Sequence, residues 1–439
     1  MVVLKIMNVA LAGVVIFVAM KKVLVITYYW PPSGGSGVQR WLKFVKYLPE
    51  FGWQPIVFTP ENPSFDVKDL SLEAEISPDT EIIKLPIWEP YRLFKRIKAE
   101  KSNQQSDLIN KKAGFFGKLL LWIRGNLFIP DPRVFWVRPA SRILQDLIIA
   151  NGIDVVITTG PPHSMHLIGL KLKRKLGVSW VADFRDTWTT WVMYESFYLS
   201  QPVRRLHKIL ERKVLKKADV VIAASRIYAN ELAQIGGRKV EVITNGYDPA
   251  EFSTTTDVMP ENFVIRHVGV VDELRDPRPL LRAVAALIEQ EDYDIQVEFI
   301  GNVNATLRDY IAADEAIKKV VSFKPYVAHS EVFDLYRTSA GLLLLPFRDM
   351  KGNIPGKLFE YLAAQRPILY IGPAGDSVDI IQSTGSGFVC EAGDVEGIKG
   401  AIRAIYTMFE AKEFNRNQNI EAFSRIQLTQ KLSHILQTL

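Results

Sequence analysis

The sequence has very little cysteine. Cys390 is the single cysteine among 439 residues. One thiol cannot form a disulfide within the chain, so the fold needs no oxidising compartment. We therefore expect a protein of the reducing cytoplasm rather than a disulfide-stabilised secreted one.

Hydrophobic runs long enough to cross a membrane are also missing. The apolar run Ile6–Met20 is shorter than the roughly 18 to 20 residues that a spanning helix needs, and no cleavage pattern of small residues precedes the first expected strand. Met20, followed by Lys21 and Lys22, would itself make a natural start of translation. Residues 1–19 are thus expected to be either an artefact of the start site or a weak anchor.

Two classes of binding motif are absent. No GxGxxG pattern is followed by a ribose-binding acid about 20 residues later, which argues against an ordinary dehydrogenase. The excess of basic residues is small, with 54 Lys and Arg against 48 Asp and Glu, and it accompanies no motif that reads nucleic acid. We therefore expect no nucleic-acid partner.

The chain does contain a repeated unit, in which a short β-branched run is followed by a turn and a stretch of helical period. This pattern is typical of parallel α/β folds. It pauses at the polar stretch Asp248–Asn262 and then restarts, and 439 residues exceed what one core usually supports. We predict two Rossmann-like domains, at residues 20–250 and 260–420, and a helical segment at 421–439. The expected strands begin at Lys22, Gln54, Asp154, Ser179, Asp219 and Val240 in the first half, and read FVIRHVG, QVEFIG, VVSF, GLLLLP, PILYIG and GFVCEA in the second.

One segment, about residues 88–138, interrupts this repeating strand–helix pattern. It has no clean strand, and the stretch from Tyr91 to Arg124 holds nine Lys or Arg against two acids, together with several aromatic residues. A basic, amphipathic insertion of this kind can contact an anionic membrane surface. The alternative is a helical excursion that packs on its own domain, with solvated lysines and a polar centre at Lys98–Asn110.

A glycine-rich turn leads from the first strand into a helix expected near Val38. Gly35 and Gly37 would let backbone amides approach a phosphate or a sugar at the positive end of that helix. Arg40 lies in the first helical turn, where a cation opposes the helix dipole, which indicates either a bound anion or a solvated side chain. These three residues are candidates for donor binding.

Two more segments, GPPHS and ADFRDTW, follow or end strands that we expect to be neighbours. Ligands of open α/β sheets bind at the carboxyl ends of the strands. Asp183 and Asp186 are therefore candidate catalytic residues that would activate an acceptor hydroxyl. His163, Arg185 and Trp188 are candidate acceptor contacts. The alternatives are that Asp186 caps a turn or pairs with Arg185, and that His163 is a loop residue bonded to the backbone.

The segment KGNIPGKLFEY carries the most specific signal. Proline suits the first position of a helix, so Lys357 and Glu360, three residues apart, would share one helix face. A diphosphate at the helix start would satisfy both the lysine and the free amides, and the carboxylate would accept hydrogen bonds from a ribose. The alternative is a surface ion pair worth a few tenths of a kcal/mol, roughly. Lys357 is a candidate catalytic cation, and the candidate donor-binding residues are Asn353, Pro355, Gly356, Leu358 and Glu360.

Another cation follows the first strand of the second half. This strand ends at Gly269, a candidate donor-binding residue, and Arg275 precedes a helix expected from Pro279 to Gln290. A guanidinium at this place could bind phosphate oxygens and offset the charge that builds on a departing diphosphate. Arg275 is thus a second candidate catalytic cation, with Arg278 as the competing choice.

Taken in this order, six segments resemble the family 4 glycosyltransferases over nearly all of the chain from Met20 onward. They are PPSGGSGVQR, GPPHSMHLIG, ADFRDTW, ITNGYDPAEF, GVVDELRDPRPLL and IPGKLFEYLAAQRPILYIGP. The resemblance implies the GT-B fold, with two facing domains and a last helix packed back on the first. It implies retaining transfer from a nucleotide-diphosphate sugar, without an essential metal or other cofactor, to a glycan or lipid-linked acceptor. It places the family's diphosphate-binding pair on Arg275 and Lys357, its ribose-binding glutamate on Glu360 and a loop glycine on Gly35.

The chain also departs from that family. The first glutamate of the family's pair, eight residues before Glu360, falls on Gly352, and a histidine that contacts the donor sugar has no clear counterpart. Two other functions therefore stay open: a sugar-nucleotide 2-epimerase or hydrolase, which needs no acceptor, and a membrane-associated scaffold with a decayed donor site. The setting that the resemblance implies is cell-surface polysaccharide or glycolipid synthesis, at the cytoplasmic face of a membrane.

Overall fold

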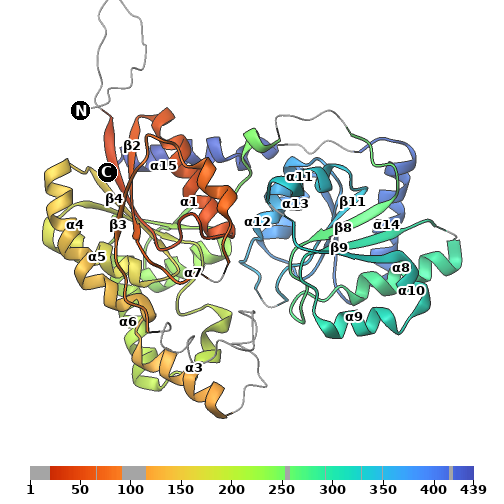
Figure 1. The fold of residues 1–439 in the computed structure, drawn as a ribbon, viewed down its shortest axis with the longest axis horizontal. Coiled ribbons are helices and arrows are strands. Elements are labelled where there is room, and N and C mark those ends of the chain that lie inside the picture. The colour runs from red at the N-terminus through yellow and green to blue at the C-terminus, as the bar shows by residue number, and fades with distance from the viewer. Residues whose placement is uncertain are drawn as a thin grey trace, which may run out of the picture.

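The computed structural model of the chain has two lobes, which lie side by side in Figure 1. The residues that it describes are 20–65, 67–90, 115–252, 258–291, 293–327, 329–348, 350–414 and 419–439. The extension predicted at residues 1–19 and the polar centre of the insertion predicted at 98–110 lie outside these ranges.

The N-terminal lobe contains a parallel sheet of seven strands. Every strand expected in this half of the chain is present. The central strands are buried on both faces, so Leu24 and Ile26 enter one core while Val23 and Val25 enter another. From edge to edge the strands are β3 (Glu81–Leu85), β2 (Trp53–Pro60), β1 (Lys21–Ile26), β4 (Val155–Gly160), β5 (Ser179–Phe184), β6 (Val220–Ala223) and β7 (Glu241–Val242).

The edge strand β3 is the one that the sequence analysis does not predict. It pairs only with β2, from Ile56 opposite Glu81 to Pro60 opposite Leu85. Its five residues are exposed or half-buried and include two charges, so its hydrophobic pattern is weak. Pairing with a buried neighbour, rather than its own composition, makes this segment a strand.

Helices cover both faces of this sheet (Figure 1). One face is packed by α4 (Val137–Asn151), α5 (Ser164–Leu176), α6 (Gln201–Lys217) and α7 (Arg226–Gly236). The other is packed by α1 (Ser36–Tyr47) and by the C-terminal α15 (Arg425–Gln437). Helix α3 (Phe115–Leu127) contacts the short turn η5 (Val192–Phe197). The other 3₁₀ turns are η1 (Leu48–Phe51), η2 (Leu70–Glu75), η4 (Pro132–Trp136), η6 (Pro249–Glu251) and η7 (Ile420–Phe423).

The C-terminal lobe contains a second parallel sheet, with six strands. All six expected strands are present, in the order β10 (Val321–Lys324), β9 (Gln296–Ile300), β8 (Val264–Val268), β11 (Gly341–Leu344), β12 (Ile368–Ile371) and β13 (Gly387–Cys390). The helices are α8 (Arg278–Glu291), α9 (Ala305–Ala312), α10 (Glu315–Val320), α11 (His329–Arg337), α12 (Gly356–Ala363), α13 (Asp376–Thr384) and α14 (Val395–Glu410). The strand order, with β8 and β11 at the centre, is that of doubly wound folds.

The last helix returns to the first lobe, which confirms the predicted architecture. Leu428, Leu432 and Leu436 of α15 belong to the same core as residues of β1 and α1. The start of α15 is fixed to the connection between the lobes, because the amide of Arg425 donates to the carbonyl of Tyr247 at 2.8 Å. Both crossings between the lobes therefore lie close together. Within the described ranges, no helix combines the length and the apolar composition that a membrane span requires.

Replacing Leu432 by alanine tests the contribution of the returning helix. Its side chain is almost fully buried against the first lobe, so the substitution should lower the free energy of unfolding of this lobe by about 2 to 5 kcal/mol. Urea denaturation followed by tryptophan fluorescence measures the effect in this lobe alone, because all nine tryptophans lie between Trp30 and Trp191. Gln430→Ala, on the exposed face of the same helix, is the control. Equal midpoints for the two variants would show that α15 adds nothing to this core.

Candidate active site

In the C-terminal lobe, Lys357 lies in the first turn of α12, against the end of β8. Gly269 follows β8 with a φ of 139°, a conformation that favours glycine. A side chain at this position would collide with the Lys357 ammonium, so the missing Cβ makes room for the lysine. The backbone thus brings together two residues that lie far apart in the sequence.

The charge of Lys357 is poorly compensated by the protein. Burial lowers its pKa to about 8, and the charge of Arg275 acts in the same direction, while Glu360 opposes both. The described residues offer the ammonium no hydrogen bond or ion pair. Helix α12 begins after Pro355, has no side-chain cap and has no acid in its first turn. The helix start is therefore electropositive and suited to an anion.

Arg275 is held within electrostatic reach of Lys357. Its Nη1 forms an ion pair with Asp272 at 2.8 Å, and its guanidinium lies 3.7 Å from the centre of the Phe347 ring. Burial lowers the pKa of Arg275, and Asp272 counteracts this. The competing Arg278 pairs with Asp276 at 2.8 Å and is more exposed. The structure thus brings Arg275, rather than Arg278, into electrostatic contact with Lys357.

Glu360 lies one helical turn after Lys357. Its Oε2 accepts a hydrogen bond from the hydroxyl of Tyr336 at 2.9 Å, and this tyrosine is buried. Burial and the neighbouring carboxylate raise the pKa of Tyr336, so the phenol stays protonated and donates. This hydrogen bond holds one carboxylate oxygen in place, and Oε1 can accept further hydrogen bonds.

His267 belongs to the same cluster and was missed by the sequence analysis. It lies in β8, where its Nδ1 is 3.0 Å from the carbonyl of Leu343, and its Nε2 is buried. Burial and the charge of Lys357 lower its pKa to about 3, so the ring is neutral at physiological pH. In the sequence, the feature that could have identified His267 is its position two residues before Gly269, at the end of a strand.

In the N-terminal lobe, the glycine-rich turn and the loop after β5 meet at the start of α1. Gly35, with a φ of 100°, is exposed and has open space where a side chain would lie. Gly37 contacts the guanidinium of Arg185, and any side chain there would collide with it. Arg185 also donates to the carbonyl of Pro161 and lies over the ring of Tyr29. The predicted Gly35, Gly37 and Arg185 are thus brought together.

Two predictions for this lobe are corrected. Arg40 and Asp183 are both buried and form an ion pair at 2.7 Å. Asp183 also accepts from Trp41 at 2.8 Å and from Thr159 at 2.9 Å, and Arg40 donates to the carbonyl of Thr244 at 2.8 Å. Burial alone would raise the pKa of Asp183, but these donors outweigh it and lower the pKa. The two charges therefore satisfy each other, and neither is available to a phosphate or to an acceptor.

Asp186 differs from Asp183 although they are three residues apart. It is half-buried, and no hydrogen bond or ion pair holds it within the described residues. Burial raises its pKa, although the charge of Arg185 acts against this. A carboxylate with a raised pKa is the better proton acceptor, so Asp186 is the stronger candidate base of the two.

Trp188 is the third correction. It is 3% exposed, and its Nε1 donates to Nδ1 of His207 at 2.9 Å, so it cannot stack on a ligand as predicted. It supports His163 instead: the two rings are parallel, with centres 4.9 Å apart. Burial lowers the pKa of His163 well below its ordinary value, and its Nδ1 has no partner within the described residues. His163 is therefore a neutral ring held in place by a tryptophan.

The two lobes touch at the position where the family has its first glutamate. A Cβ on Gly352 would lie 2.6 Å from the ring of Tyr228, at the start of α7. The neighbouring Asn353 forms a side-chain hydrogen bond with the same tyrosine, and the amide of Ile227 donates to Asp376 at 2.8 Å. An acid at residue 352 is thus sterically excluded in this arrangement of the lobes. Asn353, predicted to bind the donor, serves the contact between lobes.

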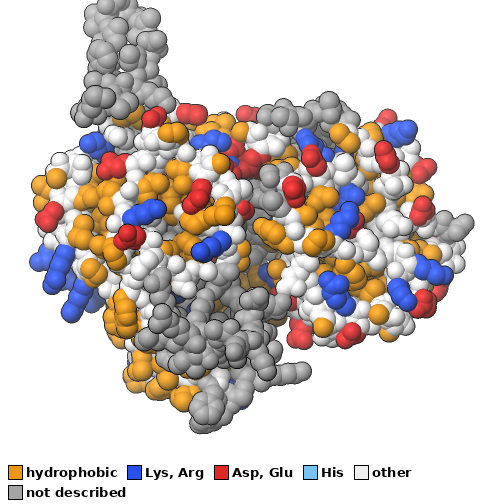
Figure 2. Space-filling view, viewed as in Figure 1, with side chains coloured by type: hydrophobic (Ala, Val, Ile, Leu, Met, Phe, Trp, Pro, Cys, Tyr) orange, Lys and Arg blue, Asp and Glu red, His pale blue; other side chains and the backbone are white. Residues whose placement is uncertain are grey.

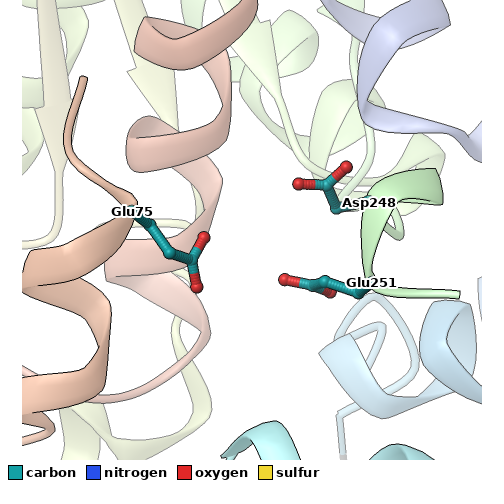
Figure 3. A group of neighbouring side chains, drawn as sticks. All are labelled: Glu75, Asp248 and Glu251. Carbon is teal, nitrogen blue, oxygen red and sulfur yellow. The ribbon is translucent and has the colours of Figure 1, made fainter. Parts of the chain in front are cut away.

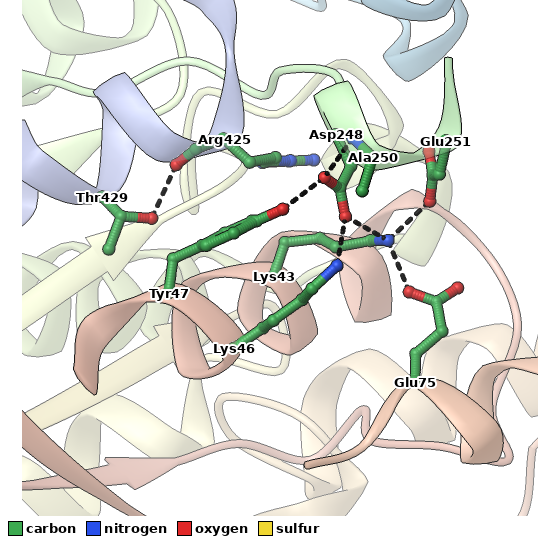
Figure 4. A network of polar contacts seen from close by, with 9 residues as sticks. All are labelled: Lys43, Lys46, Tyr47, Glu75, Asp248, Ala250, Glu251, Arg425 and Thr429. Carbon is green, nitrogen blue, oxygen red and sulfur yellow. Dashed lines mark hydrogen bonds and ion pairs between the residues drawn. The ribbon is translucent and has the colours of Figure 1, made fainter. Parts of the chain in front are cut away.

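A group of three carboxylates lies near the connection between the lobes and is drawn in Figure 3. Glu75, Asp248 and Glu251 place their oxygens within 4.8 Å of one another. Lys43 forms ion pairs with all three, at 2.8 Å to Asp248 and 2.5 Å to Glu251 (Figure 4). Its ammonium occupies the place that a metal ion would take. We therefore regard this cluster as structural.

An open cavity of about 1130 Å³ also lies between the lobes. It is lined mainly by α13, α15 and the end of β7, and Arg275, Lys357 and Glu360 take no part in it. Its lining shows no concentration of one charge. The candidate residues at the strand ends described above therefore lie outside this cavity.

Two family models match the chain. The model described as "Glycosyl transferase 4-like domain" matches residues 34–246, and the model described as "Glycosyl transferases group 1" matches residues 262–408. The chain is a family 4 glycosyltransferase. The first match ends and the second begins in the segment that connects the lobes, so each lobe of this glycosyltransferase corresponds to one model. No curated protein matches the sequence.

Solved structures resemble this glycosyltransferase over its whole fold. Sucrose-phosphate synthase from Thermosynechococcus elongatus has a TM-score of 0.62 at 14% identity, covering 95% of this chain and 98% of that one. HepE of Anabaena, solved with UDP and glucose, has a TM-score of 0.59 at 16% identity, covering 95% and 100%. WaaG, a glycosyltransferase involved in lipopolysaccharide biosynthesis, has a TM-score of 0.53 at 13% identity, covering 95% of both. These likenesses confirm the GT-B fold.

The two aspartates of the first lobe give a direct test of their different roles. Asp183→Asn should lower the free energy of unfolding by about 3 to 5 kcal/mol, because it leaves the Arg40 guanidinium buried without a counter-charge. Asp186→Asn, which removes no ion pair, should change it by less than about 1 kcal/mol. Tryptophan fluorescence during urea denaturation measures both. If the two substitutions cost the same, the structural assignment of Asp183 is wrong.

Proposed function

We propose that this glycosyltransferase moves a sugar from a nucleotide-diphosphate donor to an acceptor hydroxyl with retention of anomeric configuration. The observation that carries the proposal is the half-buried Lys357 ammonium, which has no ion pair among the described residues, at the uncapped start of α12 and within the electrostatic reach of Arg275. A desolvated ammonium near a second cation is unfavourable by itself and becomes favourable when a diphosphate binds. HepE of Anabaena, which shares the fold, has been solved with UDP-glucose.

The same residues would favour the departure of the diphosphate. As the bond from the sugar to the phosphate oxygen breaks, negative charge grows on the leaving group. Lys357 and Arg275 are held in place before the reaction, by packing on Gly269 and by the ion pair with Asp272, so they stabilise this charge without reorganisation. Two fixed cations supply the charge that a metal would otherwise supply, and we propose a transfer that needs no metal.

Glu360 would bind the ribose through its free oxygen, while the hydroxyl of Tyr336 fixes the other. On the opposite lobe, the start of α1 with Gly35, together with Arg185, would face the phosphates and the acceptor. Asp186 would accept the proton of the acceptor hydroxyl, since its pKa is raised by burial.

We further propose that the acceptor is a glycan or a lipid-linked saccharide, and that the protein acts in cell-surface polysaccharide or glycolipid synthesis, in the cytoplasm at the inner face of the membrane. WaaG and the galactosyltransferase WaaB, which share the fold, are described as proteins of lipopolysaccharide synthesis. The single, buried Cys390 suits a reducing compartment.

Replacing Lys357 by alanine tests the donor site. A thermal-shift screen with UDP, GDP, dTDP and CMP, and with their sugars, first identifies the nucleotide that raises the melting temperature. Lys357→Ala should raise the dissociation constant for that nucleotide by roughly 10- to 100-fold, because one charge-assisted hydrogen bond is lost. Glu360→Ala should also raise the dissociation constant, because the contact with the ribose is lost. Isothermal titration calorimetry gives both values.

Matched controls come from the same lobe. Arg275→Ala should weaken binding, whereas Arg278→Ala, which removes the more exposed arginine, should leave it within about twofold. Unchanged binding in Lys357→Ala would refute the proposed donor site.

The dependence of donor binding on pH gives an independent test. In the free protein the pKa of Lys357 is lowered to about 8, and a bound diphosphate would raise it. Affinity should therefore be independent of this group below pH 7 and should fall as the pH rises through 8, by up to about tenfold per pH unit. Calorimetry from pH 7 to 9 measures the slope. Lys357→Ala should bind weakly but with no such slope, and an equal slope in both proteins would contradict the assignment.

A further inference from the structure

The outer face of the N-terminal lobe carries a concentrated excess of positive charge. Helices α4, α5 and α6 hold thirteen Lys or Arg, and their only acids are Asp146 and Glu211. Their net charge of +11 exceeds the +6 of the whole chain, so the rest of the protein is acidic on balance. Figure 2 shows Lys and Arg side chains gathered at the outer edge of this lobe, with hydrophobic side chains beside them.

Few of these charges are neutralised within the protein. Lys173 pairs with Asp219 and Arg204 with Glu195. The remaining eleven form no ion pair with the residues that the structure describes. Those eleven are Arg138, Arg142, Lys171, Arg174, Lys175, Arg205, Lys208, Arg212, Lys213, Lys216 and Lys217.

The charges are close enough to repel one another. Burial lowers the pKa of Lys171 on α5, and the positive charges of Arg138 and Arg142 on α4 lower it further. Helices α4 and α5 are packed side by side, as are α5 and α6. The three helices therefore form one continuous electropositive surface, which we call the basic face.

Aliphatic side chains are exposed on the same helices. Ile143 and Ile149 on α4, and Leu206 and Ile209 on α6, are between 40% and 69% exposed. On α6 the exposed positions alternate between charge and hydrocarbon: Arg205 and Leu206 are followed by Lys208 and Ile209. Helix α3 adds Leu119 and Trp122, both 41% exposed, and is fixed to the start of α6 by the Ser200 amide, which donates to Asn126 at 2.8 Å.

We propose that the basic face docks the protein on a bilayer of anionic lipids. Cations bind lipid headgroups, and aliphatic side chains between them reach the boundary of the acyl chains. A nucleic acid is a poorer match, because the three helices that carry the cations contain no Phe, Tyr or Trp on which a base could stack, and the exposed Trp122 lies on α3 instead. The face lies on the side of the sheet opposite α1 and α15, so docking leaves the start of α1 and the other lobe accessible.

Vesicle binding tests this proposal without any donor or acceptor, so its result does not depend on the proposed reaction. The full chain should float with phosphatidylcholine vesicles that contain about one third phosphatidylglycerol, and bind pure phosphatidylcholine at least roughly 100-fold more weakly. The triple variant Arg212→Gln, Lys213→Gln and Lys216→Gln should lose about 100-fold in partition coefficient. The double variant Leu206→Ser and Ile209→Ser should lose about tenfold.

The matched control removes three exposed cations from the other lobe, as Arg282→Gln, Lys318→Gln and Lys319→Gln. It should change binding by less than about threefold, and circular dichroism melting should show that all variants fold. Equal losses in both triple variants would overturn the proposal, because net charge rather than the basic face would then explain binding. It would also be overturned if vesicles of both compositions failed to bind the native chain, or if an RNA oligonucleotide bound it while the vesicles did not.

Discussion

The buried ion pair between Arg40 and Asp183 is the interaction on which the N-terminal half of the site depends. It joins α1 to the end of β5, and the second amino group of the same guanidinium binds the carbonyl of Thr244, where the chain leaves this lobe. One turn later, Lys43 binds Asp248, Glu251 and Glu75. Two cations on one face of α1 thus join the sheet to the segment that connects the lobes.

That constraint determines what the start of α1 presents to a ligand. Because Arg40 is directed into the protein, the exposed part of the turn consists of Gly35 and its backbone amides, with Arg185 packed against Gly37. In the C-terminal lobe, the start of α12 presents Lys357 in a similar manner, against the backbone of Gly269. Both lobes therefore offer a helix start with a cation beside a glycine backbone, and the lobes touch where Gly352 approaches the ring of Tyr228.

The placement of some predicted site residues followed from local sequence patterns, whereas the placement of others did not. Lys357 and Glu360 share one face of α12, a short helix whose start is marked by Pro355. Arg275 lies between the end of β8 and the start of α8, so its place also followed from local patterns. Arg40 and Trp188 were predicted to contact ligands, Arg40 as a cation near a helix start and Trp188 as an indole after a strand. These local patterns are the same whether the side chain is exposed or buried, so they could not reveal the burial of either residue. Their partners, Asp183 and His207, lie 143 and 19 residues away. His267 was not predicted, because its environment is formed by β8, Leu343 and Lys357, which lie in three separate segments of the chain.

Local sequence patterns were enough to predict the two parallel sheets, the break between them and the helix that carries Lys357, because hydrophobic period, glycine and proline act over a few residues. Which polar side chains are exposed depends instead on tertiary packing. It made β3 a strand through pairing with β2, buried Asp183 while leaving Asp186 half-exposed, filled the carboxylate cluster with Lys43 and placed Gly352 against Tyr228. Burial and charge pairing depend on groups distant in the chain, and these set the pKa and the availability of each side chain.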